Sequence, residues 1–334
     1  MTLAEQLAAL RDGAAVATPG LRALVGVGGR DATDWLDRLS SAPVKDLPAG
    51  CCRDATLMDG KGKLRADLRL IRPAPDGAWS DEWLLEIPAS HAPALLRVLD
   101  MFILRDQVEL RDRTASHAWL AVLGPRAAGV MEAADLPRPA ACDGDGAAVV
   151  DASSGALVLP SRLYGAPGFD LALPASGVEA LRARLVAAGA TSVEREALAI
   201  VRLEAGVPWF AEDLSDGVIP LEAGLDAAVS ITKGCYPGQE VVARISNLGQ
   251  VARKLMRLSA EWSGGEPPAL AGGTMLAGTG ERAGQEAGKL TSFAHDPTRR
   301  RTLALGFVRR AYWAPGTRVA AGAAELQVEA DAHG

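Results

Sequence analysis

The 334-residue sequence lacks the features of exported and membrane-spanning proteins. Its first residues, MTLAEQLAALRDGAAV, contain no basic start followed by an apolar run, so they do not resemble a signal peptide. No stretch approaches ~18 uninterrupted apolar residues, the length at which a membrane-spanning helix is predicted. We therefore expect a cytoplasmic protein that makes no contact with a membrane.

Cysteine and histidine are scarce, with four residues of each. The cysteines are Cys51, Cys52, Cys142 and Cys235, and their spacing fits neither a zinc site nor a ferredoxin-type cluster site. The histidines show no metal-binding spacing either. We therefore predict no metal site, and free thiols in a reducing compartment.

The charge balance argues against general binding of nucleic acid. The chain has 35 Lys and Arg against 41 Asp and Glu, which gives a net charge of −6. A net negative protein is a poor binder of a phosphate backbone, although it can still hold a local basic groove. We expect no strong direct nucleic-acid binding.

Strand and helix patterns alternate over residues 1–250. Strands are predicted at 21–27, 64–71, 83–87, 118–123, 156–159 and 168–173, and helices at 31–39, 93–104, 178–188 and 194–205. In 64–71 (LRADLRLI) apolar and polar residues alternate, which is typical of a half-exposed strand. The pattern predicts an α+β region with antiparallel sheets covered by helices, subdivided near 115–145.

Residues 251–334 have a different composition, with short strand patterns, Gly-rich turns and no long helix pattern. Strands are predicted at 254–258, 286–293, 302–308, 318–320 and 325–330. This pattern favours a small closed or nearly closed β-barrel.

The segment Lys233–Glu240 (KGCYPGQE) contains the strongest candidate for chemistry. Two glycines and a proline around Cys235 predict a tight loop. A lysine two residues away favours the thiolate, and a helix starting near Val241 would add a positive field. The alternative is that Cys235 is a packed apolar residue and Lys233 a solvated charge.

Two carboxylates are candidate ligand contacts. Glu204 ends an apolar helix, where it is either an ordinary exposed charge or a partner for a ligand with two adjacent N–H donors, such as a pterin. Asp67 lies on the strand after a Gly-rich turn, where it either faces a cavity or forms the polar side of that strand. In a cavity it would contact the N5 or N10 region of a reduced folate.

The KGCYPGQE segment matches the K-G-C-[YF]-x-G-Q-E signature and resembles YgfZ-type folate-binding proteins and their mitochondrial iron–sulfur assembly relatives. Residues 202–208 (RLEAGVP) and 220–225 (PLEAGL) resemble the pattern that these proteins share with the glycine-cleavage T-protein. The resemblance runs over the whole chain in the same order.

This resemblance implies T-protein-like folate-binding domains arranged as a ring, a C-terminal barrel and a tetrahydrofolate cofactor in a central channel. It implies that Lys233 and Cys235 are the functional pair and that Glu204 contacts the pterin; Tyr236 and Gln239 are further expected cofactor contacts. The implied partners of this monomer are iron–sulfur client proteins or assembly factors, including radical enzymes that modify tRNA.

One departure bears on activity. T-proteins carry paired acids where this chain has Ala66 and Asp67, and aminomethyl transfer needs a positioned acid. Three functions stay open: an accessory factor for iron–sulfur enzymes with Cys235 as working thiol, an aminomethyltransferase or other one-carbon transferase, and a non-catalytic interaction protein. We expect the chain not to be a conventional enzyme and not to carry its own cluster.

Overall fold

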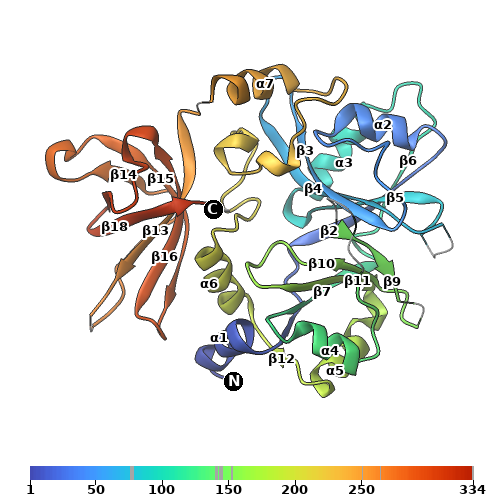
Figure 1. Cartoon of the computed structure of the whole chain (residues 1–334), viewed down its shortest axis with the longest axis horizontal. Helices are drawn as coiled ribbons and strands as arrows, with labels where there is room; N and C mark the ends of the chain where they lie inside the picture. The colour runs from blue at the N-terminus through green and yellow to red at the C-terminus, as the bar shows by residue number, and fades with distance from the viewer. Residues whose placement is uncertain are drawn as a thin grey trace.

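The computed structural model describes residues 1–75, 79–139, 142, 146–151, 153–249, 251–263 and 265–332. They form two six-stranded sheets and a closed six-stranded barrel. The two sheets lie one above the other on one side of the molecule, and the barrel lies on the other side (Figure 1). The segment from α6 (Arg195–Ala205) to α7 (Gln239–Leu248) runs between them. The predicted α+β fold with a C-terminal barrel is confirmed.

The first sheet has the strand order β6-β2-β5-β4-β3-β8 and is antiparallel throughout. Its strands are β2 (Arg22–Gly28), β3 (Cys51–Met58), β4 (Leu64–Arg72), β5 (Glu82–Pro88), β6 (Glu109–Asp112) and β8 (Gly146–Ala147). Helices α2 (Ala32–Leu39) and α3 (Ala92–Met101) cover one face. On α2 the apolar Trp35, Leu36 and Leu39 are buried together, as the helical spacing predicts.

The second sheet has the order β12-β1-β7-β11-β10-β9. Its strands are β1 (Ala15–Ala17), β7 (His117–Leu123), β9 (Val149–Val150), β10 (Leu157–Pro160), β11 (Gly168–Pro174) and β12 (Thr191–Ser192), with helices α4 (Ala127–Ala133) and α5 (Val178–Ala187) against it. Strand β1 pairs with β7 and β12, whereas the next strand, β2, belongs to the first sheet. The chain therefore crosses between the sheets near its N-terminus.

The barrel is formed by β13 (Arg253–Glu261), β14 (Met275–Gly278), β15 (Glu286–Asp296), β16 (Arg301–Arg309), β17 (Arg318–Ala321) and β18 (Ala324–Asp331), in the order β13-β16-β15-β14-β17-β18. Alternate residues of these strands fill its interior, for example Leu258, Leu290 and Val328. Closure leaves no free sheet edge among these strands.

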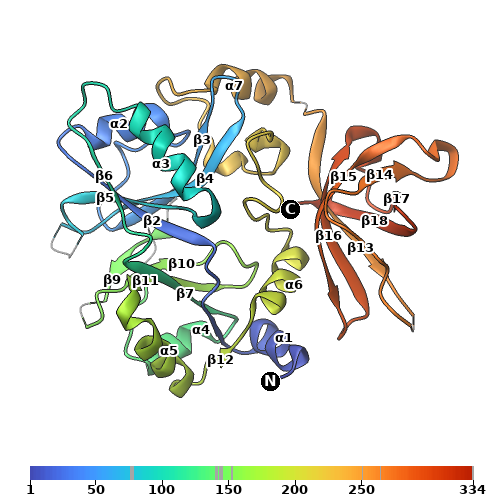
Figure 2. The same ribbon diagram turned by 180° about the vertical axis from the view of Figure 1, so that it is seen from behind.

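Helix α1 (Leu3–Asp12) packs against α6 on the side that faces the barrel, and both lie beside each other from the front and from behind (Figure 2). A capping box closes the start of α1, in which Thr2 and Glu5 bond each other's backbone N–H. Gly206 ends α6 in the left-handed conformation, at φ +75°. In the described ranges, no helix combines the length and apolar character needed to cross a membrane.

Strand β4 is buried on both faces, which corrects the prediction of a half-exposed strand. The face of the first sheet that α2 and α3 do not cover packs on the second sheet. Ile71 and Leu84 of the first sheet share one apolar cluster with Leu157 and Leu159 of the second. The polar residues at alternate positions therefore point into the space between the sheets rather than into water. Asp67 and Arg69 are 6% and 4% exposed.

The prediction for α3 is partly wrong. The helix ends at Met101, and Met101 and Leu104 are 75% and 84% exposed, so this part of the segment is outside the core. The carbonyl of the next residue, Phe102, accepts a hydrogen bond from Trp35 Nε1. Strand β3 was not predicted, and neither were the short strands β1, β6, β8, β9, β12 and β14.

Two of the four cysteines are joined in a disulfide, so the prediction of four free thiols is wrong. Cys51 and Cys142 are bonded although 91 residues separate them in sequence. Pairing of β8 with β3 explains their proximity, because Gly146 lies opposite Cys52. Of the two free cysteines, Cys52 is buried and Cys235 is exposed.

Candidate functional site

A cavity of about 410 Å³ lies where β3 and β4 face the segments that follow α6. Its lining residues come from three parts of the chain: Asp54, Ala55, Thr56 and Asp67 from the hairpin, Arg162 and Leu163 from the loop after β10, and Val207, Pro208, Leu214, Gly224, Leu225, Asp226, Ala227 and Ala228. We call this space the central cavity. Its size and its largely apolar wall with a few polar groups are typical of small-molecule sites.

Asp67 lines the central cavity, which is one of the two positions that the sequence left open for it. Its Oδ2 atom lies 3.1 Å from Arg22 Nη1 and 3.5 Å from Arg162 Nη2. Its other oxygen, Oδ1, is buried and has no hydrogen-bond donor within the described part of the chain. A buried acceptor without a donor costs free energy unless a ligand or water supplies one. Asp67 Oδ1 is therefore an acceptor whose donor would come from a ligand or a water.

A buried charge cluster holds Asp67 in place. Arg22 Nε donates to Glu86 Oε1 at 2.9 Å, and Arg69 and Arg162 lie 3.5 Å and 3.6 Å from the same carboxylate. Burial alone would raise the pKa of Glu86, but the three guanidinium groups hold it at about 2. The cluster therefore keeps three fixed positive charges beside the cavity.

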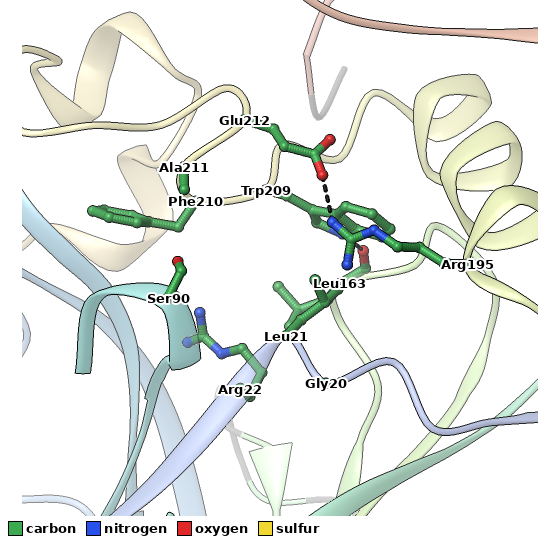
Figure 3. Close-up of a pocket in the computed structure, with 10 residues that line it drawn as sticks. All are labelled: Gly20, Leu21, Arg22, Ser90, Leu163, Arg195, Trp209, Phe210, Ala211 and Glu212. Carbon is green, nitrogen blue, oxygen red and sulfur yellow. Dashed lines mark hydrogen bonds and ion pairs between the residues drawn. The ribbon is translucent and has the colours of Figure 1, made fainter. Parts of the chain in front are cut away.

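A smaller cavity of about 180 Å³ adjoins the central cavity at Leu163, which lines both (Figure 3). Arg22 points from β2 into this space toward Ser90 and Phe210 (Figure 3). On the opposite wall Arg195 lies over the ring of Trp209, 4.8 Å from its centroid, and pairs with Glu212. Because Arg22 also bonds Asp67, the two cavities share one ion pair.

Glu204 lines neither cavity. Its Oε1 atom lies 2.6 Å from Arg11 Nη2 and 2.6 Å from Arg299 Nη1. Arg11 also pairs with Asp296 of the barrel. The carboxylate predicted to contact a pterin instead joins α1 and α6 to the barrel.

The Cys235 loop is the segment Val229–Gly238, which lies between α2 and the turn Asp59–Lys63. Tyr236 is buried and donates from its hydroxyl to Ser230 O at 2.7 Å, and Gln239 Nε2 donates to Lys233 O at 2.9 Å. Both side chains predicted to contact a cofactor thus stabilise the loop, and neither lines the central cavity. The sulfur of Cys235 is exposed.

Lys233 does not direct its ammonium group toward solvent. Only 5% of its side chain is exposed, and Nζ donates to the carbonyls of Asp37, Ser40 and Ala42 at 2.6, 2.9 and 2.9 Å. These bonds use all three N–H groups of an ammonium. Burial lowers the pKa of Lys233, although the Asp37 carboxylate opposes that shift. Lys233 therefore binds the loop to the C-terminal end of α2, and thiol activation by its direct contact is not supported.

Arg22, Arg162 and Glu86 were not predicted as site residues. One signal was available: Glu86 lies in the run WLLEI, where a single charge among apolar residues on both faces indicates a buried ion pair. No local pattern marks Arg162, because it lies in a loop. The structure describes no group of three or more His, Cys, Asp or Glu residues able to hold a metal, within the ranges given above.

Two sheets covered by helices, a closed barrel, and a cavity between the sheets and the segment after α6 define the class of T-protein-like folds. The chain matches the GCVT N-terminal domain over residues 2–233 and the glycine cleavage T-protein C-terminal barrel domain over residues 253–333. The chain therefore belongs to the glycine cleavage T-protein family.

Relatives within the family carry two kinds of name. A mitochondrial iron–sulfur cluster assembly factor homologue from Mycosarcoma maydis is 29% identical over 74% of this chain and 58% of its own length. An aminomethyltransferase from Streptomyces avermitilis is 30% identical over 70% of this chain and 63% of its own length. In each case less than two thirds of the relative's length is matched.

The glycine cleavage system aminomethyltransferase T from Bartonella henselae has the same fold. Its crystal structure superposes with a TM-score of 0.81 over 98% of this chain and 88% of that protein, at 22% sequence identity. At this identity the likeness concerns the fold.

Proposed function

We propose that this chain binds a tetrahydrofolate in the central cavity and assists assembly or repair of iron–sulfur proteins through Cys235. The observation that carries the proposal is an exposed thiol on a loop fixed by Lys233, Tyr236 and Gln239, in a T-protein fold. Exposure is what a thiol needs to reach a protein partner. The iron–sulfur assembly relative and the YgfZ-type signature at 233–240 support the same assignment.

The residues around the central cavity fit a reduced pterin. Asp67 Oδ1 would accept a hydrogen bond from a ring N–H, and Arg22 and Arg162 would orient the Asp67 carboxylate. The bound folate would supply one-carbon or redox chemistry at its reduced ring. Apolar wall residues such as Leu163 and Leu225 would exclude water from it.

Calorimetric titration with tetrahydrofolate tests the cofactor site. We expect Asp67→Asn to weaken binding about 10- to 150-fold, because one charge-assisted hydrogen bond contributes about 1.5–3 kcal/mol. Glu204→Gln is the matched control and should bind as wild type does. Loss of affinity in Glu204→Gln but not in Asp67→Asn would reverse the assignment.

Complementation tests the thiol. In cells that lack the protein, we expect wild type to restore the activity of iron–sulfur enzymes, including those that modify tRNA, and Cys235→Ser to restore none. Cys52→Ser is the control, because its buried thiol, with a pKa raised by burial to about 12, is not available to a partner. Full rescue by Cys235→Ser would refute the proposed role.

An aminomethyltransferase activity is the second candidate, favoured by the relative from Streptomyces avermitilis. Asp67 is the acid available in the central cavity for that reaction. A folate-dependent release of ammonia from an aminomethyl donor, lost in Asp67→Asn and kept in Cys235→Ser, would favour this function over the accessory role.

A further inference from the structure

A groove larger than the two cavities described above lies between the barrel and the turn before β4. It has a volume of about 530 Å³ and is lined by Lys63, Glu222, Ala252, Arg253, Met275, Glu286, Gly288, Lys289, Phe307 and Arg309. We call it the barrel groove. None of its lining residues belongs to the central cavity or to the Cys235 loop.

The barrel groove is basic although the whole chain carries a charge of −6. Four cations line it against two carboxylates, and both carboxylates are already paired: Glu222 lies 3.1 Å from Arg253, and Glu286 lies 2.7 Å from Arg309. Lys63 Nζ donates to one backbone carbonyl at 3.0 Å. Lys289 has no acidic partner within the described residues. Two positive charges therefore remain for a ligand.

The barrel groove also offers apolar surface. Met275 is 54% exposed, and the guanidinium of Arg253 covers the ring of Phe307, 4.7 Å from its centroid. A ligand that combines carboxylates with apolar side chains would use both features.

The barrel groove is connected to the Cys235 loop through α7. Gly62, next to Lys63 in the turn, lies against Gly238 and Val241 at the start of α7. Ala252 and Arg253 of the groove follow the end of that helix. A helix of ten residues is about 15 Å long, a distance that a short extended peptide spans.

We propose that the barrel groove docks an acidic segment of a partner protein that also carries apolar side chains, and thereby holds the partner over Cys235. This inference rests on the proposed function and names the class of partner. The attraction between opposite charges steers association and selects the partner, while the exposed Met275 supplies apolar contact area.

Fluorescence anisotropy with a labelled twelve-residue peptide, in which Glu residues are interspersed with Leu, tests the docking. We expect saturable binding by wild type that weakens with salt and falls at least tenfold in the double variant Lys63→Glu and Lys289→Glu. The double variant Arg97→Glu and Arg138→Glu has the same change of net charge on exposed positions outside the groove, and it should bind normally. Replacing the Leu residues of the peptide by Ser should also weaken binding.

Three outcomes would overturn the docking proposal: no binding by wild type, equal binding by both double variants, or equal competition by an oligonucleotide of the same charge. The Cys235→Ser protein should bind the peptide as wild type does. If the peptide fails to bind while Cys235→Ser still loses rescue of iron–sulfur enzymes, the docking site is wrong and the proposed function stands. If the peptide binds as expected while Cys235→Ser rescues the iron–sulfur enzymes fully, the docking site stands and the proposed role of Cys235 is wrong.

Discussion

Asp170 of β11 is a buried carboxyl with an unusual environment. Ser161 Oγ donates to its Oδ1 at 3.1 Å, whereas Oδ2 is buried without a donor in the described ranges. Burial and the nearby Glu86 carboxylate raise the pKa of Asp170 to about 7, against the pull of Arg69 and Arg162. Near neutral pH this residue therefore exchanges a proton inside the fold.

Stability should decrease as pH rises from about 4 to about 7. In that range the folded protein keeps a proton on Asp170 that the unfolded chain, with a pKa near 3.8, has released. We expect the melting temperature of wild type to fall between pH 5 and pH 8 relative to that of Asp170→Asn. Glu86 stays ionised over this range because its pKa is about 2.

Comparing wild type with Asp170→Asn cancels the contributions that other titrating groups make to the pH dependence of stability. Burial lowers the pKa values of His117 and His295, which titrate in both proteins alike. Parallel pH profiles for the two proteins would contradict the assignment to Asp170.

Single residues show where sequence reasoning succeeds and where it stops. A cavity position for Asp67 and an exposed Cys235 were each one of two alternatives that the sequence left open, and the structure places both residues so. A Gly-rich turn and a tight loop are local patterns, which is why both residues could be singled out. Glu204 and Lys233 were assigned to a ligand and a thiol, but each is held by groups almost 200 residues away, Arg11 and Asp37. No local pattern reveals such partners, because the fold decides them.

At the scale of elements, the contact between the Cys235 loop and α2 depends on one ammonium group. The last carbonyls of a helix have no partner within the helix, and Lys233 bonds those of Asp37 and Ser40. Its positive charge also suits the negative end of the helix dipole. The loop is also joined to the segment after α2 by the bond from Ser230 N to Ser41 O.

Replacing Lys233 by Met should loosen this contact. Loss of these charge-assisted bonds should lower the free energy of opening the loop by about 1.5–3 kcal/mol. Hydrogen exchange in residues 229–238 should therefore accelerate about 10- to 150-fold. Folate binding should not change, because Lys233 does not line the central cavity. The control Lys45→Met removes an exposed ion pair with Asp34 and should leave exchange in this loop unaltered. Unchanged exchange in Lys233→Met would show that the bonds of Ser230, Tyr236 and Gln239 suffice to hold the loop.

Strands could be predicted from the sequence where one face lies in a core and the other in solvent. Five of the six barrel strands were predicted, and β17 and β18 alternate between a buried and a more exposed face. Strand β14 was missed, and β16 is buried on both faces because its second face packs against α6. Strand β4 was predicted in position but not in burial, since the second sheet covers its polar face and no feature of 64–72 records that. Strand β3 was missed because Arg53 and Asp54 interrupt its apolar residues.

At the scale of the whole molecule, ion pairs join the barrel to the sheets. Arg11 of α1 bonds both Glu204 of α6 and Asp296 of β15, and Asp296 is 1% exposed. Arg257 of β13 adds a bond to the carbonyl of Glu204 at 2.9 Å. Because Arg11 bonds a carboxylate on each side, it is the central residue of this contact.

We expect Arg11→Ala to weaken attachment of the barrel. Asp296 would keep only its bonds from Thr298 and the backbone N–H of Arg299, and a buried carboxylate without its cation is destabilising. Hydrogen exchange should increase in α1 and in the β15–β16 hairpin, with a lower melting temperature. Arg318→Ala removes an exposed pair with Glu325 and serves as the control. Equal melting temperatures for Arg11→Ala and wild type would show that the apolar contacts of α1 and α6 suffice.

The crossing of the chain between the two sheets also has a consequence during synthesis. Strand β1 pairs with β7 and with β12, so Ala15 meets its second partner, Thr191, only after almost 180 further residues have been made. At roughly 5–20 residues per second, ribosomes need about 10–35 s for that length. Until β7 has been made the apolar β1 has no strand partner at all, and one of its edges stays unpaired until β12 follows.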